Sequence, residues 1–348
     1  MHPYVRLARA RRAAALLVAA PLLIASCSDS GSKSTTQGSG SGSSASASAG
    51  AGGASGGGGG TCTPKAGKDL VVMADDKQSQ ASDNIVAIAT TSVAKPPLTT
   101  ALDKVSAALS QEALVGLNRA VSSSGGETPS GAAKKFISDN KLADGLSGGS
   151  GSITIGTQAF AESNVLGAVY QQVLNAAGYK ATARQVGSRD LLEPAVEKGE
   201  IQVVPEYAAS LTQFLAQKFK TSDKASADIT KTMATLKPLA ARAKFMALTP
   251  AAATDQNAFA VTKGTADAYQ LKTFSDVASK CGSSLTFGAG ANCPANPFCQ
   301  DAIKAAYGVT VQLKPLDYDG PLTRKALQQG RILVGEVFSS DADLVKAS

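Results

Sequence analysis

The sequence predicts an α/β protein that folds into two lobes. From residue 153 onward, short runs rich in β-branched residues alternate with segments of helical periodicity. Such alternation is typical of α/β lobes with mainly parallel sheets. About 285 residues follow a low-complexity stretch near the N-terminus, which is enough for two lobes of ordinary size.

The elements predicted after residue 152 come in a regular order. A helix over residues 162–177 places Val165, Val169 and Val173 on one apolar face. A short helix over 190–198 stops at Gly199. We expect the strand at 201–204 to end at Pro205. Strands are predicted at residues 153–155, 180–186, 201–204, 285–287, 309–313 and 332–334.

The chain before residue 153 has a different pattern. Strands are predicted at residues 70–73 and 85–88, and three helices follow in series. Each helix carries an apolar stripe at helical spacing, and these stripes include Leu102, Leu117 and Phe136. Residues 147–152 (SGGSGS) predict a short flexible linker before the next strand.

Residues 1–27 have the features of a lipoprotein signal. Arginines between residues 6 and 12 precede an apolar run over 13–24, which is shorter than the ~20 residues that span a bilayer. Small residues then precede Cys27, as in a lipobox. We expect cleavage before Cys27 and attachment of a lipid to it, which would hold the protein at the outer face of a bacterial cell membrane. The alternative is an ordinary secretory signal with a chance cysteine.

Residues 28–61 consist almost entirely of Ser, Gly and Ala, with Asp29 and Lys33 as the only charges. Such a segment cannot bury enough apolar surface to offset its chain entropy. A Gly/Ser chain of this length has a root-mean-square reach of ~30 Å. We therefore expect a disordered tether that lifts a folded body off a membrane.

Removal of the signal changes the charge and the available chemistry. The signal holds four of the 34 basic residues and none of the 27 acidic ones, so 30 basic and 27 acidic residues leave a net charge of +3 rather than +7. No basic run remains that would indicate a nucleic-acid partner. His2, the only histidine, is removed as well, which excludes Ser-His or Cys-His catalysis and a histidine zinc site. We expect no catalytic residue, metal or cofactor, and therefore not an enzyme.

The other cysteines predict disulfides. Cys62, Cys281, Cys293 and Cys299 remain after Cys27, and an even number in an exported protein indicates pairing. Cys293 and Cys299 bracket a segment with two prolines, so we expect them to close a small loop. Cys62 and Cys281 are the remaining pair, and their bond is left open.

Residues 153–210 carry a resemblance to a known family. ITIGTQAFAES (153–163) and VGSRDLLEPAVEKGEIQVVPEYAAS (186–210) resemble substrate-binding proteins of ABC importers for glycine betaine, choline and related osmoprotectants. In that family a Gly-Ser-Lys-like turn precedes Phe-Thr-Glu, and a Gly-Ser-Arg turn, Gly-Glu-Ile and Pro-Glu-Tyr-Thr-Gly-Thr follow. The segments 287–308 and 326–344 continue the resemblance in family order. It implies a two-lobed periplasmic-binding-protein-like fold with a hinge and an interlobe cleft.

The order of the segments departs from the family. DLVVMADDK (69–77), DNIVAIATT (83–91) and the helices over 101–121 and 132–142 resemble the family's C-terminal quarter, yet they stand at the front. The sequence therefore resembles a circular permutant, with residues 147–152 joining the family's original termini. Permutation costs little when the original termini are exposed and close together. The alternative is that residues 63–142 form an unrelated helical domain.

The resemblance implies the domain division. Residues 86–256 would form lobe 1, and residues 63–85 with 257–348 would form lobe 2. The hinge would lie in the two crossover segments, which we map to residues 84–90 and 257–261. Cys62 and Cys281 would then share lobe 2, which makes their bond plausible.

The resemblance also implies site residues. Proteins bind a quaternary ammonium with aromatic faces and nearby negative charge. Tyr207 matches the tyrosine of Pro-Glu-Tyr, and Ser210 matches the last residue of that segment, a donor to a ligand oxygen. Phe259 falls where the family often has Tyr. Phe160 and Tyr318 are further candidates at the cleft, and plain packing is the alternative for each aromatic residue.

Two departures bear on the ligand. The family's Lys after Gly-Ser falls at Gln158, and an Arg before its Pro-Gly-Leu turn falls at Asn296. In glycine betaine binders of the family such cations hold the ligand carboxylate, and without them the charge-assisted bonds are lost. The amides of Gln158 and Asn296 could bind a hydroxyl or neutral group instead, which favours choline or another ligand without a carboxylate.

The leading hypothesis is thus a monomeric solute-binding lipoprotein. It would capture a small quaternary-ammonium solute, of the choline or glycine betaine type, between its lobes and deliver it to ABC permease subunits. The alternatives are the same fold with a different small molecule, a surface interaction or sensing lipoprotein without transport, and an enzyme on the same scaffold. The missing histidine disfavours the last.

Overall fold

The computed structural model describes residues 62–345, except for 292, 296–297 and 318–320. The chain divides into two units, Met1–Gly56 and Gly57–Ser348. All described residues lie in the second unit. None of the helices in the described residues is long and apolar enough to cross a membrane.

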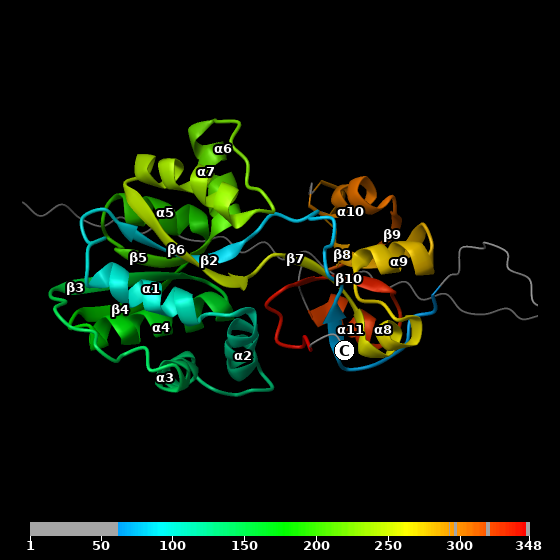
Figure 1. The fold of residues 1–348 in the computed structure, drawn as a ribbon, viewed down its shortest axis with the longest axis horizontal. Coiled ribbons are helices and arrows are strands. Elements are labelled where there is room, and N and C mark those ends of the chain that lie inside the picture. Colours follow the sequence, from blue (N-terminus) through cyan, green and yellow to red (C-terminus); the bar gives the residue numbers. More distant parts are fainter. Residues whose placement is uncertain (1–61, 292, 296–297, 318–320, 346–348) are drawn as a thin grey trace, which may run out of the picture. The chain divides into compact units, whose positions relative to one another are not determined.

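The described residues form two five-stranded sheets, each with helices packed on it (Figure 1). We call each sheet with its helices a lobe. The strands of lobe 1, in sheet order, are β4 (Lys180–Gly187), β3 (Ser152–Gln158), β5 (Val203–Tyr207), β2 (Asn84–Thr90) and β6 (Phe245–Thr254). Those of lobe 2 are β1 (Leu70–Val72), β7 (Asn257–Thr262), β10 (Val334–Phe338), β8 (Ser284–Gly290) and β9 (Thr310–Leu316).

Helices cover both faces of the lobe 1 sheet. They are α1 (Leu98–Ala108), α2 (Gln111–Val121), α3 (Pro129–Asp139), α4 (Ala161–Ala176), α5 (Arg189–Glu197), α6 (Ala208–Phe219) and α7 (Ile229–Arg242). Strand β2 is buried along its whole length. Ile85, Ala87 and Ala89 face one apolar core, and Val86 and Ile88 face the other, because successive side chains of a strand point to opposite faces. A fully buried strand therefore reads as a continuous apolar run.

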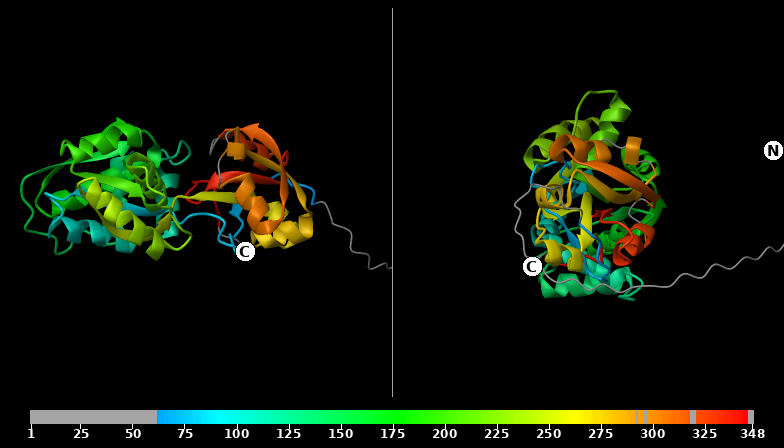
Figure 2. Two further views of the ribbon diagram at one scale, coloured as in Figure 1. Left: turned by 90° about the horizontal axis from the view of Figure 1, so that it is seen from above. Right: turned by 90° about the vertical axis from the view of Figure 1, so that its right-hand side faces the viewer.

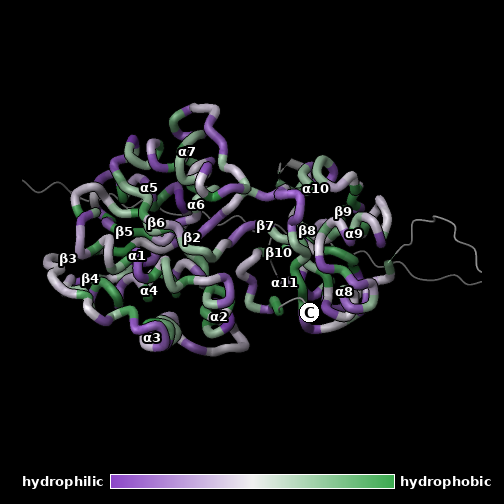
Figure 3. Tube along the Cα trace, viewed as in Figure 1, coloured by the Kyte–Doolittle hydropathy of each residue, from purple (hydrophilic) through white to green (hydrophobic). Residues whose placement is uncertain are grey.

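Lobe 2 is smaller and has the same layered plan, which the views in Figure 2 show from two further sides. Its helices are α8 (Lys263–Tyr269), α9 (Phe274–Cys281), α10 (Gln300–Tyr307) and α11 (Pro321–Gln328), with a 3₁₀ turn at Cys293–Ala295. Phe259, Phe274 and Phe287 form the centre of one core. Polar and apolar residues alternate along the helices of both lobes (Figure 3), as expected for helices with one face on a sheet.

Most predicted elements are confirmed, and the prediction that Pro205 ends a strand is wrong. Strand β5 runs through Pro205, which lies opposite Ala87 of β2. The amide of Thr90 donates to the carbonyl of Gln202, so by alternation Pro205 occupies a position without hydrogen bonds to β2. Strand β3 pairs with β5 only at Val203. The missing N–H of Pro205 therefore removes no hydrogen bond between β5 and β2.

Two connections carry the chain between the lobes. One joins β1 to β2 over residues 73–83, and the other joins β6 to β7 at residues 255–256 (Figure 1). The expected hinge ranges, 84–90 and 257–261, lie within β2 and β7. The proposed division between residues 85 and 86 falls inside β2, which belongs to the lobe 1 sheet.

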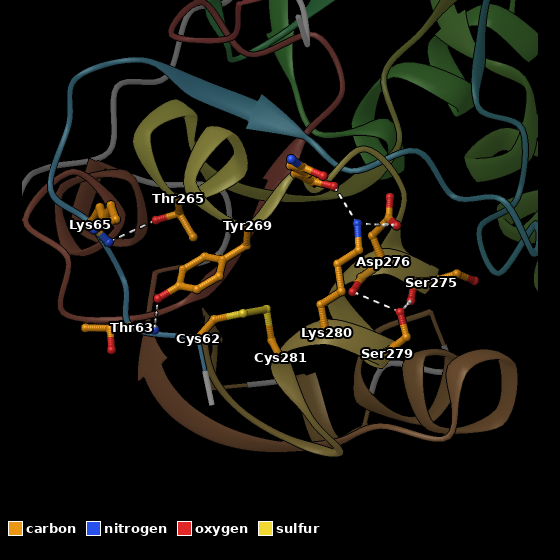
Figure 4. Close-up of a disulfide and its surroundings, with 11 residues drawn as sticks. Cys62, Thr63, Lys65, Thr265, Tyr269, Ser275, Asp276, Ser279, Lys280 and Cys281 are labelled. Carbon is orange, nitrogen blue, oxygen red and sulfur yellow. Dashed lines mark hydrogen bonds and ion pairs between the residues drawn. A yellow bond between two sulfur atoms is a disulfide. The ribbon is translucent and has the colours of Figure 1, made fainter. Parts of the chain in front are cut away.

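Both ends of the described chain lie on lobe 2. The amide of Val345 donates to the carbonyl of Leu70 at 2.9 Å, and Leu70 pairs with Leu344 in a parallel bridge. Cys62 forms a disulfide with Cys281 at the end of α9. Figure 4 shows the next residues along lobe 2, where Thr63 donates to the hydroxyl of Tyr269 and Lys65 to that of Thr265.

The second predicted disulfide is also present. Cys293 and Cys299 are bonded, with Cα atoms 5.3 Å apart. Both residues are almost fully buried in lobe 2. The bond closes a short loop between β8 and α10.

Candidate functional site

A cavity of about 730 Å³ lies between residues of the two lobes. Its walls include the carboxyl ends of three strands. In lobe 1, Gln158 ends β3 and Tyr207 ends β5. In lobe 2, Phe338 ends β10. Ligand sites of open α/β sheets typically lie just outside the carboxyl ends of the strands, so this cavity is the candidate site.

Four of the seven residues expected at the ligand line this cavity. Gln158, Phe160, Tyr207 and Ser210 all do so. Phe259 does not, because it is 2% exposed and packs in the core of lobe 2, with ring centroids 5.3 Å from Phe274 and 5.7 Å from Phe287.

Three other predicted positions fall outside the described residues. These are Asn296 and Tyr318, expected at the ligand, and Cys27, expected to carry the lipid.

Tyr207 is held in place by a buried carboxylate. Its hydroxyl donates to Oε1 of Glu162 at 2.8 Å, and the residue is 4% exposed. Burial, with the nearby charge of Glu162, raises the pKa of Tyr207 well above its ordinary value, so the phenol remains a neutral donor. The ring of Phe160 lies 6.1 Å from that of Tyr207, with planes 36° apart. The two rings give lobe 1 an aromatic wall, and Phe160 is 40% exposed.

Ser210 is hydrogen-bonded to an acid on the connection from β1 to β2 (residues 73–83), which we call the crossover segment. Its hydroxyl donates to Oδ2 of Asp83 at 2.5 Å. Oδ1 of Asp83 accepts from the amides of Ala209 and Ser210 at 2.7 and 3.0 Å, in the first turn of α6. Burial raises the pKa of Asp83 to about 6 despite these bonds. The proton of the Ser210 hydroxyl is therefore directed at Asp83, and the hydroxyl oxygen is what remains for a ligand.

Two amide groups of the cavity wall are incompletely bonded. Nδ2 of Asn118 donates to Oε2 of Glu162 at 2.5 Å and to the carbonyl of Ser340 at 2.9 Å, which identifies its other atom as the oxygen. That oxygen, and Nε2 of Gln158, are buried without a hydrogen-bond partner in the described residues. Unpaired buried polar atoms are costly, so both are candidate ligand contacts.

Both cations among the described cavity residues are paired with carboxylates. Arg189 binds Glu206 through Nε and Nη2, at 2.8 to 3.1 Å. Arg324 lies 2.8 Å from Asp341 and 3.4 Å from Asp343. These pairs offset the positive charge of both arginines, which weakens their attraction for a carboxylate on a ligand.

The cavity is rich in acids and aromatic rings. Burial raises the pKa of Glu162, against the lowering effect of its hydrogen bonds. The hydroxyl of Ser340 donates to Asp255 at 2.5 Å. The acids that line the cavity are Asp83, Glu162, Asp255 and Asp341, and the aromatic residues are Phe160, Tyr207, Phe298 and Phe338. Such a set suits a cation with apolar substituents.

The sequence did not identify several of these residues. Phe338 follows a strand that we predicted at 332–334, whereas β10 spans Val334–Phe338. The correct end of the strand would have marked Phe338 as a cleft residue. Phe298 lies in the disulfide loop, and its position depends on how that loop closes. In the described residues, no group of three or more His, Cys, Asp or Glu side chains is placed to hold a metal ion.

Comparison with known proteins identifies one family. The model of the substrate binding domain of ABC-type glycine betaine transport system matches residues 64–139 and 151–347. No curated protein matches the sequence.

Several solved structures show distant likeness. The clavulanic acid biosynthesis oligopeptide binding protein 2 is 14% identical, with 51% of this chain and 42% of the other covered and a TM-score of 0.25. The pheromone receptor PrgZ, a peptide binder, is 11% identical, with 53% and 46% covered and a TM-score of 0.24. NikA from Brucella suis, in complex with Fe(III)-EDTA, is 11% identical, with 53% and 51% covered and a TM-score of 0.24. The chain spans about half the length of these proteins or less, and at such TM-scores the likeness carries no argument about the ligand.

Proposed function

Since the chain belongs to the family of substrate-binding domains of ABC-type glycine betaine transport systems, we propose that it binds a small quaternary-ammonium solute in the cavity between its lobes. It then delivers the solute to an ABC permease. Domains of this family act outside the cytoplasm, and the two disulfides fit an exported protein.

The composition of the cavity carries the proposal. Aromatic residues come from both lobes, since Phe160 and Tyr207 belong to lobe 1 and Phe298 and Phe338 to lobe 2. Aromatic faces attract a quaternary ammonium, and the attraction grows where water is excluded. The acids of the wall add negative charge, because they outnumber the two arginines. A cation is therefore favoured over a neutral or anionic solute.

The paired arginines favour choline over glycine betaine. Glycine betaine carries a carboxylate, and Arg189 and Arg324 already bind carboxylates of the protein. Choline carries a hydroxyl, which can accept a hydrogen bond from Nε2 of Gln158, an atom without a partner in the described part of the chain. A hydrogen bond that pairs a buried donor is worth about 1 kcal/mol.

Calorimetric titration of the purified mature protein tests the ligand. We expect choline to bind more tightly than glycine betaine, and carnitine, polyols and sugars to bind weakly. Binding of a polyol or sugar in place of choline would favour a different small molecule. Failure of every solute would favour an interaction or sensing role.

Tyr207 provides the sharpest variant for this test. Tyr207→Ala should weaken choline binding by about 1 kcal/mol or more because an aromatic face is lost. Tyr207→Phe, which keeps the ring but not the bond to Glu162, should bind choline more tightly than Tyr207→Ala. Phe259→Leu is the control, because Phe259 lies in the core of lobe 2. It should lower the melting temperature and leave the affinity unchanged.

The proposal includes a lipid anchor on Cys27. It rests on the arginines, the apolar run and the small residues that precede this cysteine. Cys27→Ala should move the protein from the membrane fraction to the soluble fraction of cells. Membrane retention of this variant equal to that of the unaltered protein would contradict the anchor.

The proposal also includes circular permutation. The family match is interrupted over residues 140–150, which overlap the linker at 147–152. The two ends of the described chain lie side by side at Leu70 and Val345. Segments that meet in this way can be rejoined by a short connection, so permutation costs little.

A further inference from the structure

Phe298 reaches the cavity from a loop of lobe 2. The loop connects β8, which ends at Gly290, with α10, which begins at Gln300. The disulfide of Cys293 and Cys299 closes it directly beside Phe298. Cys293 is 1% exposed and Cys299 is 0% exposed, so the bond fixes the loop to the core of lobe 2.

A second contact holds the same loop from the crossover segment. Nε2 of Gln80 donates to the carbonyl of Phe298 at 3.0 Å. Gln80 is itself 4% exposed, and its backbone amide donates to Asp75 at 2.8 Å. Asp75 in turn accepts a hydrogen bond of 2.5 Å from the hydroxyl of Tyr307 in α10. The crossover segment thus holds the loop through Gln80. It also holds α10, the helix that follows the loop, through Asp75.

We propose that the Cys293–Cys299 disulfide and Gln80 are positioning elements of the ligand site, which hold Phe298 as the wall of lobe 2 that faces a quaternary ammonium. This inference rests on the proposed function. Phe160 and Tyr207 offer aromatic faces from lobe 1, and Phe298 offers one from lobe 2. A ring that is already fixed loses less conformational entropy when the ligand binds than a ring on a mobile loop does.

The direct test separates the charge of the ligand from its shape. Titration calorimetry on the full-length mature protein compares choline with its neutral isostere, in which carbon replaces nitrogen. Phe298→Leu keeps an apolar side chain and removes the aromatic face. It should weaken choline binding about fivefold and change binding of the isostere much less. A role in packing alone would weaken both ligands equally.

The positioning elements are tested with Phe298 left in place. The double variant Cys293→Ser with Cys299→Ser, and separately Gln80→Met, should each weaken choline binding about threefold or more. The control is Cys62→Ser with Cys281→Ser, which opens the other disulfide, whose residues do not line the cavity. It should lower the melting temperature but leave choline affinity unchanged.

Each outcome bears on a different claim. Weaker choline binding by the Phe298, Gln80 and Cys293/Cys299 variants, with unchanged choline binding by the Cys62/Cys281 control, supports the inference. Unchanged affinity in folded Phe298→Leu and Gln80→Met proteins overturns it, even if the serine variants fail to fold. Absence of choline binding by the unaltered protein overturns both this inference and the proposed function.

Discussion

Individual cavity residues could be predicted where they end a strand within a recognisable motif. Gln158 and Tyr207 stand at the ends of β3 and β5. Recognising the motifs that contain them was therefore enough to place both residues at the cleft. Phe259 shows the limit of this reasoning. Asn257 lines the cavity, whereas Phe259 lies two residues, or ~7 Å, further along the same strand. That displacement moves its ring from the cleft into the core.

Glu336 is a buried acid that no motif indicated. It lies in the middle of β10, opposite Phe259, and is 1% exposed. Neither of its carboxyl oxygens has a hydrogen-bond partner of regular geometry within the described residues. Burial raises its pKa to about 7, and the backbone of Gly290 opposes this only in part. The folded protein therefore favours the neutral acid.

This shift makes stability depend on pH. The folded pKa lies above the ordinary value of 4.5, so the contribution of Glu336 is fully present below pH 4.5. It is lost as the pH rises through about 7, by an amount on the order of 3 kcal/mol. Glu336→Gln should therefore raise the free energy of unfolding at pH 8 relative to the parent protein and change it little at pH 4.

Urea unfolding at pH 4, 6 and 8 measures this difference between variant and parent. Glu200→Gln serves as the control, because Glu200 is exposed, and it should give the same small change at every pH. A difference between Glu336→Gln and the parent that does not vary with pH would contradict a neutral buried acid.

At the scale of elements, the helices before residue 153 belong to the same core as the strands after it. One apolar cluster combines Leu98, Leu102 and Leu114 with Val165, Val169 and Tyr170. Helical periodicity was sufficient to predict α1 to α4. Strand β6 was not predicted, because its sequence FMALTPAAAT is rich in alanine. It forms a strand because β2, a fully buried neighbour, pairs with it.

The shared core predicts the outcome of truncation. A chain that begins at Ser152 would expose the face of α4 that α1 to α3 cover, including Val165 and Val169. We expect this shortened chain to aggregate or to lack cooperative unfolding, as judged by circular dichroism and light scattering. A stable, monomeric protein from residues 153–348 would instead favour an independent helical domain before residue 153 and would remove the basis for the permutation.

At the scale of the whole folded unit, the arrangement of lobes does not require this order of segments. The chain could be cut within residues 147–152 and rejoined from Leu344 to Asp69, because Leu70 and Leu344 already lie side by side. Since the two segments run parallel, the new linker must turn back along one of them and needs several residues. The contacts of the lobe 1 core and of the cavity would be unchanged, but the segment before Asp69 would be lost, and with it the Cys62–Cys281 disulfide of lobe 2.

The rearranged protein should therefore fold and bind choline with the affinity of the natural order. Its free energy of unfolding should fall by roughly 2–4 kcal/mol because the Cys62–Cys281 disulfide is lost, and the change in loop-closure entropy adds only ~1 kcal/mol to this difference. Urea unfolding and titration calorimetry measure both quantities. Tyr207→Ala should weaken binding in both orders to the same extent. A rearranged chain that folds but does not bind would show that the order of segments matters to the site.

The Cys62–Cys281 bond determines where mechanical force enters the folded unit. Cys62 is joined covalently to the end of α9, eight residues before β1 begins at Leu70. Tension applied through the preceding chain is therefore borne by α9 and not by β1. Peeling β1 from β7 would break its hydrogen bonds one after another, but the covalent bond diverts the load before it reaches that edge. Force at the N-terminal end would thus enter lobe 2 between α9 and β8 and would spare the edge strand β1.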